Sequence, residues 1–116
     1  MAVAYDTTIN QGADWYINFV YQDTDTSTPI NITGYTAALQ LRSLPSDITA
    51  VLSLSSPSNG ITITGAQGLV AVHATAVQTG AIVAGYYYYD LEITSTASVV
   101  TRLVQGQILV SPQVTR

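Results

Sequence analysis

The chain has 116 residues, no cysteine and no lysine, and three arginines against seven acidic residues give it a formal net charge of -4. This length fits one domain over residues 1–116. So few cations exclude the many phosphate contacts of nucleic-acid binding, and the lack of cysteine excludes disulfides and thiolate metal sites. Because only 9% of residues are charged, we expect a neutral surface that neighbouring protein molecules cover in an assembly. The alternative is a free, soluble sandwich with a neutral, threonine-rich surface.

The N-terminal segment, residues 1–10, has neither the basic region nor the apolar region of a signal peptide. No apolar run in the sequence approaches the length of a membrane span. We therefore expect no membrane partner and no visible secretion signal.

Apolar and polar side chains alternate with a period of two residues in the first half of the chain, which is typical of half-buried strands. Strands are expected at 15–22, 35–42 and 48–54, with a polar turn at 23–29 and a proline-containing loop at 43–46. The expected apolar faces are Trp15, Ile17, Phe19 and Tyr21, then Tyr35, Ala37, Leu39 and Leu41, then Ile48, Ala50, Leu52 and Leu54.

The second half begins with the strongest turn signal, residues 55–60, which contain Pro57 and the Asn59-Gly60 pair. Two short strands at 61–64 and 69–73 would then form a hairpin. Alternation stops at 75–83, where Thr75 and Gln78 match a capping box and predict one or two helical turns.

A long hairpin is expected at the end of the chain, with strands at 86–93 and 99–110. Its apolar face consists of Tyr87, Tyr89, Leu91 and Ile93. A three-residue loop at 96–98 would place Glu92 opposite Arg102 and Tyr88 opposite Gly106. A two-residue loop would turn one strand's core face outward, so we prefer the first register.

About eight short strands at regular spacing, with one short helix near 75–83, predict an all-β fold. The class that fits best is an immunoglobulin-like antiparallel β-sandwich. A small eight-stranded β-barrel is the alternative.

Residues that could carry chemistry are few. His73 is the single histidine, and no motif supplies it with a carboxylate and a nucleophile. Asp90 and Glu92 share a strand face at a spacing that a glycosidase could use for acid–base catalysis. Their place on the solvent face, where Arg102 can neutralise one of them, accounts for both carboxylates without catalysis. The acidic turn at 23–29 lacks the glycine and glutamate of a calcium loop. We therefore expect no enzyme activity, no metal site, no cofactor and no small-molecule substrate.

Outward-facing tyrosines are the main candidates for binding. Tyr86 and Tyr88 lie on the face opposite the apolar one, where with Leu103 they could form a protein interface. They could also stack on sugar rings, the basis for a host-glycan-binding module as an alternative function. Val114 and Arg116 in the terminal arm complete the candidate interface.

Four segments carry a resemblance to a known family: residues 10–15 (NQGADW), 32–37 (ITGYTA), 84–93 (AGYYYYDLEI) and 100–116 (VTRLVQGQILVSPQVTR). They resemble small tailed-bacteriophage and prophage virion structural proteins and, more loosely, the N-terminal β-sandwich domain of phage baseplate upper proteins. The resemblance implies a non-enzymatic component located in the virion, whose partners are other virion proteins and copies of itself. A tail, baseplate or fibre-attachment adaptor is expected first, with a capsid cement (decoration) protein as an alternative.

Overall fold

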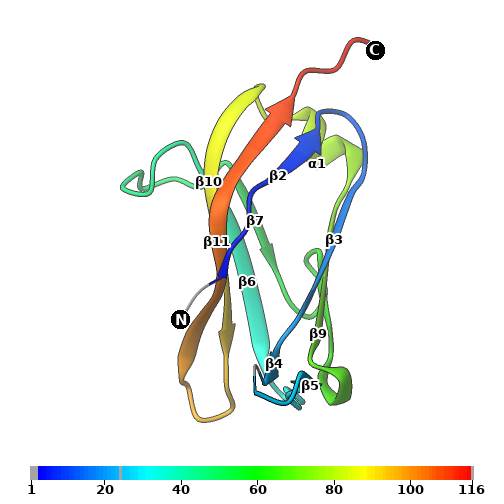
Figure 1. The fold of residues 1–116 in the computed structure, drawn as a ribbon. Coiled ribbons are helices and arrows are strands. Elements are labelled where there is room, and N and C mark those ends of the chain that lie inside the picture. Colours follow the sequence, from blue (N-terminus) through cyan, green and yellow to red (C-terminus); the bar gives the residue numbers. More distant parts are fainter. Residues whose placement is uncertain (1–2, 24, 116) are drawn as a thin grey trace.

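Two β-sheets pack face to face in the computed structural model, which describes residues 3–23 and 25–115 (Figure 1). Side chains that alternate along the strands fill the space between the sheets and form one core cluster. The all-β sandwich predicted from the sequence is therefore confirmed.

The larger layer, here called sheet A, is six-stranded with the order β1-β11-β10-β6-β7, and β2 also pairs with β11. Its strands are β1 (Val3–Ala4), β2 (Thr7–Asn10), β6 (Thr36–Arg42), β7 (Leu52–Ser55), β10 (Gly85–Thr94) and β11 (Val100–Ser111). The short N-terminal strands β1 and β2 run parallel to β11, and the other pairs in sheet A are antiparallel. The sequence did not predict these N-terminal strands.

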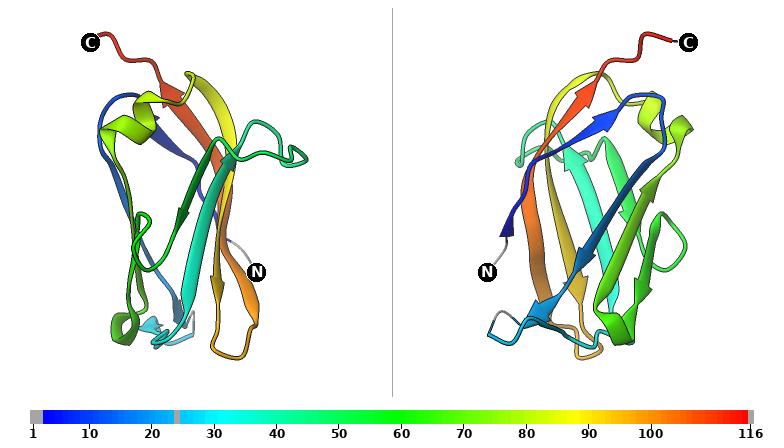
Figure 2. Two further views of the ribbon diagram at one scale, coloured as in Figure 1. Left: turned by 180° about the vertical axis from the view of Figure 1, so that it is seen from behind. Right: turned by 45° about the vertical axis from the view of Figure 1, so that its right-hand side comes forward.

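The smaller layer, sheet B, has the order β3-β9-β8, and all its pairs are antiparallel (Figure 2). Its strands are β3 (Trp15–Val20), β8 (Ile61–Thr64) and β9 (Leu69–Ala74). A separate two-stranded ribbon joins β4 (Gln22–Asp23) to β5 (Thr28–Pro29), and the 3-10 helix η1 (Gly65–Gln67) connects β8 to β9.

The α-helix of the described residues, α1 (Ala76–Gly80), lies in the predicted region but ends before residue 83. The predicted capping box is present, because Thr75 accepts from the backbone N–H of Gln78 and the Gln78 side chain accepts from the N–H of Thr75. None of the helices in the described part of the chain has the length and apolar character needed to cross a membrane.

The core-facing tyrosines follow the predicted alternation: Tyr87 and Tyr89 are buried, and Tyr86 and Tyr88 are exposed. The strand predicted at 48–54 is wrong over its first half, since β7 begins only at Leu52. Ile48, predicted to face the core, is 96% exposed. The reason is a set of hydrogen bonds from Arg42 that hold residues 43–51 as a loop.

The C-terminal hairpin has the predicted register only near its tip. Glu92 lies opposite Arg102, as predicted, but a β-bulge then shifts the pairing by one residue. The bulge leaves Leu103 without a Cα partner and places Tyr89, not Tyr88, opposite Gly106. Such a bulge depends on packing across the sandwich, which the alternation of one strand does not encode.

Candidate functional site

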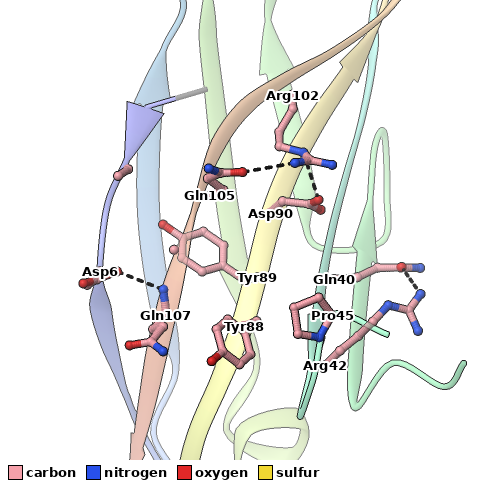
Figure 3. A pocket seen from close by; sticks show the side chains of 12 residues that line it. Asp6, Gln40, Arg42, Pro45, Tyr88, Tyr89, Asp90, Arg102, Gln105 and Gln107 are labelled. Carbon is pink, nitrogen blue, oxygen red and sulfur yellow. Dashed lines mark hydrogen bonds and ion pairs between the residues drawn. The ribbon is translucent and has the colours of Figure 1, made fainter. Parts of the chain in front are cut away.

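The outer face of sheet A carries an open groove with a volume of about 530 Å³, here called the sheet A groove (Figure 3). Strands β6, β10 and β11 form its floor, and the β1–β2 connection and Pro45 form its sides. Tyr88 points into it because even-numbered residues of β10 face outward. Its charged and amide side chains are Asp6, Gln40, Arg42, Asp90, Arg102, Gln105 and Gln107.

One of the two arginines in the groove forms an ion pair. The Nε of Arg102 lies 3.3 Å from Oδ2 of Asp90, and its Nη1 donates to Oε1 of Gln105 at 3.1 Å. The sequence placed Glu92 opposite Arg102, and the Cα register agrees, but the described ion pair is made diagonally with Asp90. Since both partners are partly exposed to solvent, the pair adds only ~0–1 kcal/mol to stability and chiefly orients the two side chains.

The other arginine organises a loop. Arg42 donates from Nη1 to the carbonyl oxygens of Asp47 and Ile48 at 3.0 and 2.9 Å, and from Nη2 to Oε1 of Gln40 at 2.7 Å. The loop is closed further by the backbone N–H of Leu44, which donates to Oδ2 of Asp47 at 3.1 Å. These hydrogen bonds fasten the loop 43–51 to β6, and the Ile48 side chain lies in solvent.

Of the five candidate interface residues, the structure brings two together. Tyr86 and Tyr88 lie on the outer face of β10 and are 72% and 39% exposed. Leu103 instead packs against the core, because the bulge turns it partly inward. Val114 is 91% exposed in the C-terminal segment that leaves the sandwich (Figure 1), and Arg116 lies outside the described residues.

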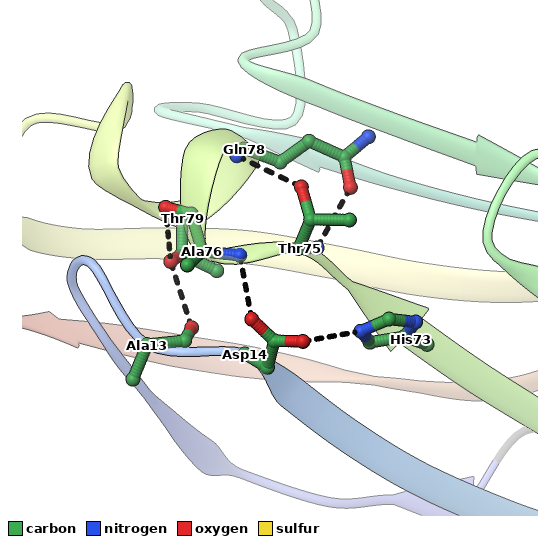
Figure 4. Close-up of polar contacts among 7 residues, drawn as sticks. All are labelled: Ala13, Asp14, His73, Thr75, Ala76, Gln78 and Thr79. Atoms are coloured by element: carbon green, nitrogen blue, oxygen red, sulfur yellow. Dashed lines mark hydrogen bonds and ion pairs between the residues drawn. The ribbon is translucent and has the colours of Figure 1, made fainter.

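A second polar cluster surrounds His73 on sheet B (Figure 4). Its Nε2 lies 2.9 Å from Oδ2 of Asp14, and its ring stacks on Tyr16 with centroids 4.3 Å apart. The other carboxylate oxygen of Asp14 accepts from the N–H of Ala76 at 2.9 Å. The hydrogen bond from His73, followed by that from Ala76, lowers the pKa of Asp14 below its usual range.

The sequence did not predict the contact between Asp14 and His73, which are far apart in the chain and meet through the pairing of β3 with β9. A nucleophile would be needed to make this pair a catalytic triad. Within residues 3–23 and 25–115, no hydroxyl group is hydrogen-bonded to His73. The pair therefore joins the start of β3 to the end of β9 and the first turn of α1.

Neither a protein-family model nor a curated protein matches this sequence. Among solved structures, the chain is similar to CopC from Methylosinus trichosporium OB3b, with a TM-score of 0.50 and 10% sequence identity. The alignment covers 96% of this chain and 88% of CopC. At this identity the likeness shows the β-sandwich fold.

The structural role in a phage particle that the sequence led us to expect is contradicted by this comparison. It points to CopC, a copper-binding periplasmic protein, and not to a virion protein. The roles as a tail adaptor, a capsid cement protein and a host-glycan-binding module are therefore all wrong as predictions. The sequence segments on which that expectation was based form strands and turns, and such elements specify a β-sandwich fold rather than a function. The family resemblance itself stays a prediction.

Copper binding cannot be transferred to this chain either. Copper sites draw on imidazole and sulfur ligands, and the sequence contains one histidine and no cysteine. Across the described ranges, no three His, Cys, Asp or Glu side chains gather where they could hold a metal ion. The described residues therefore give no ground for assigning copper to this chain, whose one methionine, Met1, lies outside them.

Proposed function

We propose that the chain is a non-enzymatic protein-binding module that receives a partner protein on the sheet A groove and the adjoining loop 43–51. The observation that carries the proposal is the position of Ile48, 96% exposed at the tip of a loop that Arg42 holds in place. Burying such a side chain completely at an interface contributes about 1.5–3 kcal/mol. A loop that presents it on a rigid sheet is a common arrangement for recognition.

The groove beside the loop supports the same role. Pro45 of the loop, Arg42 and Tyr88 line it together, and tyrosine is favoured at protein interfaces because one side chain offers apolar area and a hydroxyl. Tyr86 extends the surface along the same strand. The proposed binding surface therefore combines aromatic, aliphatic and hydrogen-bonding groups.

The state of the charged groups indicates the chemistry of the partner. Arg102 is paired with Asp90, and the Arg42 guanidinium is occupied by backbone carbonyls and an amide oxygen. The carboxylate of Asp6 also has a partner, since its Oδ1 accepts from the backbone N–H of Gln107 at 2.9 Å. The groove thus offers mainly amide and tyrosine groups to an incoming chain. The partner should present an apolar side chain for the Ile48 end of the surface and peptide or amide groups for the groove.

Site-specific photo-crosslinking tests the proposal. A photoreactive amino acid at Ile48 or Tyr86, in a lysate of the source cells, should give one and the same discrete adduct with another protein. Thr62, exposed on the outer face of sheet B, is the control position and should not give it. With the identified partner purified, Ile48→Ser combined with Tyr88→Ala should weaken binding about tenfold or more, and Thr62→Ala should not.

Two outcomes would overturn the protein-binding role. One is the same adduct pattern from Thr62 as from Ile48. The other is no adduct from Ile48 and Tyr86 while the protein remains folded.

A further inference from the structure

Strand β3 is an edge of sheet B with an unpaired side. Within the described residues it pairs with β9 alone. His73 of β9 lies opposite Tyr16, and its backbone N–H donates to the carbonyl of Gly60 on the β8 side. Tyr16 is therefore in a pair that exchanges no backbone hydrogen bonds. By alternation, the backbone groups of Tyr16, Asn18 and Val20 point away from β9, toward the open edge.

The core is also incompletely covered along this edge. Val72 and Val70 of β9 are fully buried, but their cross-strand partners Ile17 and Phe19 on β3 are only partly buried. Phe19 gains some cover from Tyr5, whose ring meets it edge-on at 6.2 Å between centroids. An added strand beside β3 would extend sheet B and cover the apolar side chains that the sandwich leaves open.

The sequence of β3, WYINFV, contains none of the features that protect natural sheet edges. It has no charge, no proline and no bulge, and five of its six residues are aromatic or β-branched. The edge of β7 differs, since Asn59 blocks it: its Nδ2 donates to the carbonyl of Ser53 at 3.4 Å and its backbone bonds to Ser55 at 2.8 Å. Among the described strands at the edges of sheets A and B, β3 alone offers an unobstructed length of six residues.

We infer that β3 pairs antiparallel with β3 of a second copy of the chain across a two-fold axis. Outward-facing side chains must stay outward in both copies, so residue 18 can face residue 18 or residue 17 can face residue 17. A register centred on Ile17 would place the carboxylate of Asp14, which is already bound to His73, opposite the apolar side chain of Val20 of the second copy. The register centred on Asn18 avoids this and is the one we assign.

The Asn18 register is self-complementary. Tyr16 lies opposite Val20 of the second copy on the outer face, an aromatic and β-branched pair of the kind that stabilises sheets. Ile17 lies opposite Phe19 on the core side, where both are partly exposed in a single chain. Asp14 would face Gln22, so no two carboxylates meet. The edge groups of Tyr16, Asn18 and Val20 then form the hydrogen-bonded pairs, and the two three-stranded sheets B become one continuous sheet.

This inference goes beyond the proposed function, because it concerns the other sheet and a different partner. Sedimentation equilibrium of the full chain should show a monomer–dimer equilibrium. Asn18→Lys would place two ammonium groups face to face on the axis and should raise the dissociation constant about tenfold or more. Thr62→Lys makes the same charge change on β8, which β9 separates from the β3 edge, and should not raise the constant.

A second measurement tests the register. The chain has no cysteine, so Asn18→Cys introduces a single thiol. Hydrogen-bonded antiparallel pairs have Cα atoms about 5.5 Å apart, so a short thiol-to-thiol cross-linker can bridge the two introduced thiols. It should therefore yield a linked dimer for Asn18→Cys and little for Thr62→Cys. A wild-type chain that stays monomeric at high concentration, or a dimer that Asn18→Lys leaves intact, would overturn the inference and leave the edge to a strand of another protein.

Discussion

At the scale of single residues, the four consecutive tyrosines of β10 point alternately to the two faces of sheet A. Tyr86 and Tyr88 face solvent, and Tyr89 reaches through the core to donate its hydroxyl to the carbonyl of Tyr5 at 2.6 Å. Gly106 lies opposite Tyr89, and a Cβ there would sit 2.2 Å from that same carbonyl oxygen. The glycine therefore lets the N-terminal strands cross closely enough for Tyr89 to hold them.

We predict that Tyr89→Phe lowers the free energy of unfolding by about 1 kcal/mol near neutral pH, because the carbonyl of Tyr5 loses its donor. Burial raises the pKa of Tyr89, so its contribution is fully present below its unfolded pKa of about 10 and is lost as the pH rises further. Urea unfolding of both proteins should show a stability difference that shrinks above about pH 10. Tyr86→Phe, at an exposed position, is the control. A difference that stays constant into the alkaline range would contradict this account.

At the scale of elements, α1 is too short to be stable alone, and contacts with the β2–β3 connection hold it. The buried hydroxyl of Thr79 donates to the carbonyl of Ala13 at 2.8 Å and accepts from the N–H of Gly12 at 3.1 Å. Asp14 accepts from the first N–H of the helix, at Ala76. One helical turn thus closes the end of the sandwich by hydrogen bonding rather than by an apolar face.

Thr79→Val keeps the shape of this side chain and removes its hydrogen bonds. We predict a loss of about 1–3 kcal/mol in the free energy of unfolding, because the backbone groups of Gly12 and Ala13 are left unpaired. Chemical denaturation can measure the change against Thr62→Val, which should stay within about 0.5 kcal/mol of wild type on an exposed strand face. Equal effects of the two substitutions would show that the Thr79 hydroxyl does not anchor the helix.

Elements with a local signal were predictable from the sequence. The faces of β3, β6 and β10 follow from alternation, and the start of α1 follows from the Thr75 cap. Pairing of β1 and β2 with β11 was missed, because their partners lie about a hundred residues away along the chain. The same limit applies to the candidate site: the outward position of Tyr88 was predictable, but the exposure of Ile48 depends on hydrogen bonds from Arg42.

At the scale of the whole molecule, the charge of the chain and the unprotected edge of β3 act in opposite directions on self-association. A single chain carries a formal net charge of -4 at pH 7, yet β3 itself contributes none of it. Self-association through this strand therefore brings two negatively charged molecules together without ion pairs at the contact. Net repulsion between copies opposes the dimer, while apolar burial and backbone hydrogen bonds favour it.

This balance predicts the salt dependence of self-association. Raising NaCl from about 20 mM to about 300 mM shortens the screening length from about 20 Å to below 10 Å, so repulsion falls and the dissociation constant should decrease several-fold. The Asn18→Lys chain should recover part of its lost association under the same change, since the two introduced charges repel each other less. Sedimentation equilibrium at graded salt measures both. A wild-type dimer that weakens with salt must be held by ion pairs, which an uncharged β3 cannot supply, and its contact would have to lie elsewhere on the molecule.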